Sequence, residues 1–163
     1  MRIAVTATLA LAVMLTGMAA NAQSSLPDPG LTPGALNPAV TQENIAETIC
    51  VPGWTRTVRP PREFTSAMKR EQIDAAGFED RRMGHYEEDH LVPLELGGAP
   101  SDPRNLWPEP RQPADGWGAD RKDVLEYQLG RLVCAGRLSL SEAQQAIATD
   151  WIVAYRRYVP QPG

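Results

Sequence analysis

The sequence predicts an α+β fold, a mostly helical single domain built around one small β-hairpin. Two long segments, 118–134 and 139–158, repeat apolar residues at helical spacing. Before them, two short runs at 85–92 and 105–107 have the composition of paired strands and are separated by a loop. The chain that remains after an N-terminal export segment is about 140 residues long, the usual size of one domain.

The first residues, MRIAVTATLALAVMLTGMAANAQ, have the pattern of a secretory signal peptide. Arg2 supplies a positive start, residues 3–18 are apolar apart from Thr and Gly, and the Ala-Asn-Ala run at 20–22 is a small-x-small cleavage site. A membrane anchor is the alternative, but the apolar run is short for a span of about 20 residues. We therefore expect residues 1–22 to be removed and the protein to be secreted or periplasmic, with no membrane anchor after cleavage.

Composition also suggests where the folded region begins. Residues 23–38 are rich in Pro, Gly and Ser and predict a flexible leader, so we expect the domain over 39–159.

The formal net charge is -4, which does not favour nucleic-acid binding over the whole surface. Between positions 56 and 82, however, basic residues exceed acidic ones. A phosphate-facing patch and an ordinary solvated helix face both fit that local excess.

Local signals predict the elements before the hairpin. Thr41 can cap a short helix that ends near Ile49, and residues 50–61 are expected to form a turn followed by an extended piece. Residues 64–75 have helical apolar spacing. Gly77 is well placed to end that helix.

The elements from the hairpin onwards have clearer signals. The strand at 85–92 is followed by Gly97-Gly98, which permits the positive φ needed to turn the chain back, and 105–107 is the expected return strand. A helix is predicted over 118–134. The Ser-Leu-Ser-Glu sequence at 139–142 is a capping-box pattern that opens the last helix.

Cys50 and Cys134 are the only cysteines, one near each end of the folded region. In an exported chain an even pair usually forms a disulfide, which for so long a loop stabilises the fold by about 4 kcal/mol in the chain-entropy model. Two unpaired thiols are the alternative, which an oxidising compartment disfavours. A zinc site is poorly supported, because two Cys without CxxC spacing and two His are too few ligands.

Residues 86–98, YEEDHLVPLELGG, join an acidic run to His90, a short apolar segment and a Gly-Gly pair. Pro93 cannot continue a central ladder, so a strand that ends at Asp89 and His90 can present both side chains at its rim. Asn105, on the return, is a short amide that can hydrogen-bond backbone groups across the turn. Histidine has a pKa of about 6.5, which suits a general base at neutral pH.

The order of these residues resembles the HNH, or ββα-metal, nuclease superfamily. The resemblance lies in DHLVPLELGG at 89–98, NLWPE at 105–109 and the helix that follows. It implies a hairpin–helix core that hydrolyses phosphodiester bonds in DNA, or in RNA, with a divalent metal ion, Mg²⁺ first and Mn²⁺ or Ca²⁺ as alternatives. It also implies that Asp89 is a metal ligand, His90 the general base and Asn105 the residue that orients the base. The CVPGWTRTVRP segment and the last helix also look like those of small secreted bacterial proteins that carry such a domain.

The helix departs from the family pattern at one position. In that family the helix usually carries His or Asn three residues before a Lys, but the residue three before Lys122 is Ala119, which cannot bind metal. Asp120, Asp123 and Glu126 are the nearby carboxylates, and the expected ligands besides Asp89 are Asp120 and Asp123.

Other interpretations of the same residues stay open at this point. His90 can be a structural histidine bonded to Asp89, and Asp123 and Glu126 can form surface pairs with Lys122 and Arg131. An exported scaffold of this fold that binds a partner or nucleic acid without cleaving it is the alternative function. A hydrolase that acts on another polymer, such as the cell wall, is a third.

Overall fold

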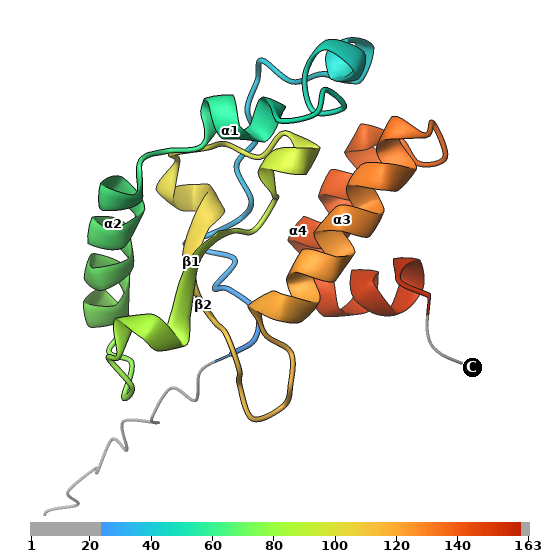
Figure 1. Cartoon of the computed structure of the whole chain (residues 1–163). Helices are drawn as coiled ribbons and strands as arrows, with labels where there is room; N and C mark the ends of the chain where they lie inside the picture. The colour runs from blue at the N-terminus through green and yellow to red at the C-terminus, as the bar shows by residue number, and fades with distance from the viewer. Residues whose placement is uncertain (1–23, 161–163) are drawn as a thin grey trace, which may run out of the picture.

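The computed structural model describes residues 24–160, so the predicted signal peptide at 1–22 lies outside the described residues. Within this range the chain forms four α-helices, four short 3-10 helices (η) and two β-strands, which confirms the α+β class (Figure 1). In chain order the elements are η1 (Gln42–Glu47), α1 (Trp54–Val58), α2 (Arg62–Ala75), η2 (Met83–His85), β1 (Tyr86–His90), η3 (Leu94–Leu96), η4 (Pro103–Asn105), β2 (Leu106–Pro110), α3 (Ala119–Cys134) and α4 (Leu140–Tyr158).

The two strands form one antiparallel hairpin that lies between the helices. β1 pairs with β2 in a register that sets Asp89 opposite Trp107 and His90 opposite Leu106. Figure 1 shows α2 on one side of the hairpin and α3 and α4 on the other. The loop after β1 supplies the central apolar contacts between the hairpin and these two helices. The core includes Leu91, Val92, Leu96, Leu125, Leu129, Val133, Ala143, Ile147 and Trp151.

The Gly-Gly turn is required by close backbone approach. Gly97 has φ 71°, in the left-handed region. Gly98 has no room for a side chain, because a Cβ there would lie 1.8 Å from Val92 O. These two glycines therefore bring the loop back onto the residues that follow β1.

Several element boundaries differ from the predictions. Residues 54–58 form a helix rather than an extended piece, because Gly53 turns the chain at φ 84° and the chain becomes extended again only at Arg59, before a proline. The return strand begins and ends later than expected, at Leu106–Pro110. It accommodates two prolines because each strand of a two-stranded sheet is an edge strand.

Residues 24–38, predicted to be a flexible leader, are packed on the domain. Trp151 Nε1 donates to Ser25 O at 2.9 Å, and Leu36 forms an isolated β-bridge with Gly98. The segment has the composition of a linker, but its hydrogen-bond partners are far away in the sequence. It is therefore part of the folded domain, which begins before residue 39.

The predicted disulfide between Cys50 and Cys134 is confirmed, with Cα atoms 5.6 Å apart and a sequence separation of 84. It ties the segment before α1 to the end of α3. No helix in residues 24–160 is long and apolar enough to cross a membrane.

Removing this disulfide should lower the free energy of unfolding by about 4 kcal/mol, because an unfolded chain without the cross-link gains loop entropy. The test is chemical denaturation of the oxidised protein and of a Cys50→Ser, Cys134→Ser double variant. Adding a reductant should shift the midpoint of the wild-type protein only. Equal denaturation midpoints for the wild-type protein and the double variant, both without reductant, would contradict the prediction.

Candidate active site at the end of β1

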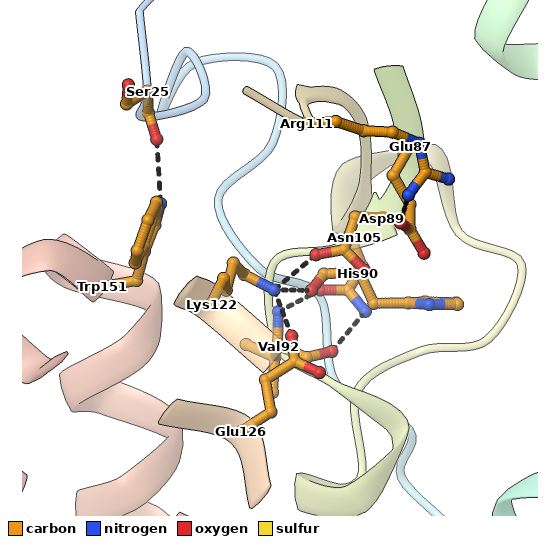
Figure 2. A network of polar contacts seen from close by, with 10 residues as sticks. All are labelled: Ser25, Glu87, Asp89, His90, Val92, Asn105, Arg111, Lys122, Glu126 and Trp151. Atoms are coloured by element: carbon orange, nitrogen blue, oxygen red, sulfur yellow. Dashed lines mark hydrogen bonds and ion pairs between the residues drawn. The ribbon is translucent and has the colours of Figure 1, made fainter. Parts of the chain in front are cut away.

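Asp89 and His90 lie on opposite sides of β1, as consecutive strand residues do. Asp89 faces α3, where its Oδ2 accepts a hydrogen bond of 2.6 Å from Lys122 Nζ. The imidazole of His90 points away from that contact, and its Nε2 lies 2.9 Å from Pro100 O (Figure 2). The two predicted site residues are thus adjacent in sequence but belong to two different polar environments.

The contact with Pro100 defines the protonation of the His90 ring. A carbonyl oxygen can only accept, so Nε2 carries the hydrogen and the neutral ring keeps its lone pair on Nδ1. Nδ1 makes no hydrogen bond within residues 24–160. His90 is 4% exposed, and this burial lowers its pKa.

The charges around His90 act in both directions. The bond to Pro100 and the carboxylate of Asp89 favour the imidazolium, whereas the cations Arg59 and Lys122 disfavour it, and the net result is a lowered pKa. His90 is therefore neutral at pH 7, with a lone pair able to accept a proton.

Asn105 fixes the backbone on both sides of the His90 loop. Its side chain is fully buried; Oδ1 accepts from Val92 N at 2.9 Å, and Nδ2 donates to Val92 O at 2.9 Å and to Ala99 O at 3.1 Å. Since these contacts join the chain just after His90 to the chain just before Pro100, Asn105 orients the ring through the backbone and does not touch it.

Asn105→Ala should lower the free energy of unfolding by about 3 kcal/mol, because three hydrogen bonds are lost and their buried backbone partners stay unsatisfied. Urea denaturation measures the change. Asn44→Ala is the control, since Asn44 makes its side-chain bonds at an exposed helix start and its loss should cost about 1 kcal/mol. A smaller effect at Asn105 than at Asn44 would exclude this role.

Lys122 is the centre of the second polar environment. Its side chain is fully buried, and Nζ donates to Asp89 Oδ2 at 2.6 Å, to His90 O at 2.7 Å and to the carboxylate of Glu126. Burial alone would lower the pKa of Lys122, but the carboxylates of Asp89, Glu126 and Glu109 raise it well above its usual range. Lys122 is thus a buried, fully charged ammonium group.

Three carboxyl groups interact with the ammonium group of Lys122, and their pKa values shift in different directions. Glu109 is fully buried on β2, and burial raises its pKa well above the usual range. The neighbouring charge of Asp89 raises the pKa of Glu109 further, whereas Lys122 lowers it. Burial also raises the pKa of Glu126 to about 8. Burial opposes the charge of Asp89 too, but Lys122 outweighs it and the pKa of Asp89 is lowered.

The structure places the predicted metal ligands on two elements, Asp89 on β1 and Asp120 and Asp123 in the first turns of α3. Asp89 is bonded to Lys122. Partial burial, followed by the charges of Asp89 and Glu87, raises the pKa of Asp123. Within residues 24–160, no group of three or more His, Cys, Asp or Glu side chains could hold a metal ion. A divalent-cation site built on Asp89, Asp120 and Asp123 stays a prediction, and we derive no chemical step through a metal.

Two functional candidates were not singled out from the sequence. Glu109 follows the NLW motif and shares a sheet face with Asp89, which the strand register reveals. Arg59 lies exposed between α1 and α2, and its charge contributes to the lowered pKa of His90. The local sequence carries no signal for this electrostatic interaction between Arg59 and His90.

Comparisons with known protein families, with curated proteins and with solved structures found no match. The link to HNH nucleases thus rests on the residues of the hairpin and stays a resemblance.

Proposed function

We propose that this chain is an exported endonuclease that hydrolyses phosphodiester bonds in DNA, with RNA as the alternative substrate, and that His90 is its general base. The observation that carries the proposal is the state of the His90 ring: Nε2–H is held by Pro100 O, and Nδ1 is a neutral acceptor. The Asp-His, Gly-Gly and Asn-Leu order supports the substrate class. The disulfide and the sequence of residues 1–22 support export.

In this reaction His90 Nδ1 takes a proton from water while the water oxygen attacks phosphorus. The P–O bond to the leaving oxygen breaks, and that oxygen takes up a proton from solvent. A phosphodiester is anionic and repels the nucleophile, so a nearby cation must offset its charge. Arg59 is the exposed cation whose charge reaches His90, and its planar guanidinium suits the oxygens of a phosphate.

Arg59→Ala should slow cleavage about 100-fold, as expected for the loss of one charged group at a reacting phosphate. The acidic limb of the pH–rate profile should also move to higher pH, because Arg59 no longer lowers the pKa of His90. Arg56→Ala is the matched control, an exposed arginine three residues earlier, in α1. Equal rates for the Arg59 and Arg56 variants would remove Arg59 from the mechanism.

The test of the function is digestion of plasmid DNA and of RNA by the purified exported protein with Mg²⁺, with Mn²⁺ and with EDTA, beside a peptidoglycan digest. We expect cleavage of nucleic acid in at least one condition, its loss in His90→Ala, and its retention in His85→Ala. His85 is the control because it is exposed and pairs with Asp80 at the other end of β1. Turnover of peptidoglycan alone, or no turnover at all, would reject the proposal.

A second candidate is an exported scaffold that binds nucleic acid or a partner without cleaving it. Buried Lys122 favours this second candidate, because its ammonium group pairs with Asp89 and Glu126. Asp89 is the residue that binds a metal ion if the resemblance to HNH nucleases holds. It predicts salt-sensitive retention of DNA in a gel-shift assay with no products in any of the digests.

A further inference from the structure

The contacts of Lys122 use all the hydrogen-bond donors of its ammonium group. An ammonium group has three N–H donors. Lys122 Nζ has three oxygen acceptors, which are Asp89 Oδ2, the backbone oxygen of His90 and Oε1 of Glu126 (Figure 2). Every donor is therefore used, and two of the three acceptors come from the two residues that end β1.

The acceptors are also chemically those of a cation site. Oxygens of carboxyl groups and of backbone carbonyls are the hard donors that divalent cations take in proteins. The buried carboxyl group of Glu109 lies on the same face of the hairpin as Asp89. The positive charge comes from α3, one turn beyond Ala119, where the family pattern expects a metal ligand.

We propose that Lys122 is a built-in cation, which binds the end of β1 to α3 as a bound divalent ion otherwise would. The geometry of the site then needs no metal. Lys122 is a positioning residue and not a catalytic one, because its ammonium is fully buried and contacts His90 at the backbone oxygen and not at the ring. The statement that cleavage needs no metal rests on the proposed function; the statement about the fold does not.

The first experiment uses the wild-type protein and needs no activity. Its melting temperature is measured after EDTA treatment and then with increasing Mg²⁺, Mn²⁺ or Ca²⁺. We expect shifts below about 1 °C, because a ligand stabilises only a protein that binds it. A saturating rise with any of these metals that EDTA reverses would overturn the inference.

The second experiment removes the ammonium and leaves its acceptors in place. Lys122→Ala should lower the melting temperature by about 10 °C or more, and Mn²⁺ or Ca²⁺ should recover part of that loss. The matched control is Lys69→Ala. Lys69 Nζ also donates to buried backbone, to Met83 O at 3.0 Å and Tyr86 O at 2.9 Å, but to no carboxylate. An identical metal response of the two variants would overturn the inference, and if Lys122→Ala does not fold, the wild-type titration decides.

The third experiment separates this inference from the proposed function. Cleavage by the wild-type protein should have the same rate in EDTA and in Mg²⁺. Cleavage that EDTA abolishes would overturn the inference and leave the nuclease proposal intact. Absence of any cleavage would reject the nuclease proposal, and the melting experiments would still decide the role of Lys122.

Discussion

Lys122→Met should lower the free energy of unfolding by about 3–5 kcal/mol at pH 7, because removing one partner of a buried ion pair leaves the other charge uncompensated. Methionine keeps the length and the apolar stem of the lysine, so the change isolates the ammonium. It leaves Asp89 without its cation and His90 O without its donor. Urea denaturation measures the loss, and Lys69→Met is the control on the other side of the hairpin.

The loss of unfolding free energy in Lys122→Met should depend on pH. Asp89 has a lowered pKa in the folded protein, so its pairing stabilises the fold above its unfolded pKa of about 3.9, and that stability is lost as the pH falls through the folded pKa. The difference between wild type and Lys122→Met should therefore persist from pH 7 to about pH 4 and shrink as the pH falls further. A difference that stays constant below about pH 4 would show that the ion pair is not its cause.

His90→Ala should reduce the rate of phosphodiester cleavage by about 10²–10⁴-fold, the range that a general base contributes. The pH dependence follows from the lowered pKa of His90. Because the ring is neutral above that pKa, the wild-type rate should be constant from pH 8 down to about 6.5 and fall only below it. Cleavage rates across this range measure the effect, and an acidic limb centred above pH 6.5 would contradict the assignment of His90.

The same shift predicts a small effect on stability. A histidine with a lowered folded pKa contributes stability that is present above its unfolded pKa of about 6.5 and is lost as the pH falls from there towards the folded value. His90→Ala removes this dependence. The fold of the variant should therefore lose less stability than wild type between pH 6.5 and pH 5.

Features that depend on local sequence signals could be predicted from the sequence. Asp89, His90 and Asn105 lie within one short motif, and Asn105 contacts the backbone across the Gly-Gly turn in the way a short amide at that position predicts. The two long helices were predictable because each repeats apolar residues over several turns. The disulfide followed from an isolated cysteine pair.

The features that could not be predicted from the sequence depend on contacts between segments that are far apart in the chain. The bond from Lys122 to Asp89 joins residues 33 positions apart, and a fully buried lysine runs against the usual exposure of this residue type. Five residues of α1 are too few to show a helical period. The packing of residues 24–38 depends on Trp151, in the second half of α4, and composition carries no trace of that contact.

The most direct test of the central claim, that His90 is the base of a phosphodiester hydrolysis, is the initial rate at which supercoiled plasmid is nicked at pH 7 by three proteins. These are the wild type, His90→Ala and His85→Ala, assayed side by side. The claim predicts equal rates for wild type and His85→Ala, and a rate at least about 100-fold lower for His90→Ala. A His90→Ala rate equal to that of the wild type, or a wild-type rate no higher than that of plasmid alone, would contradict it.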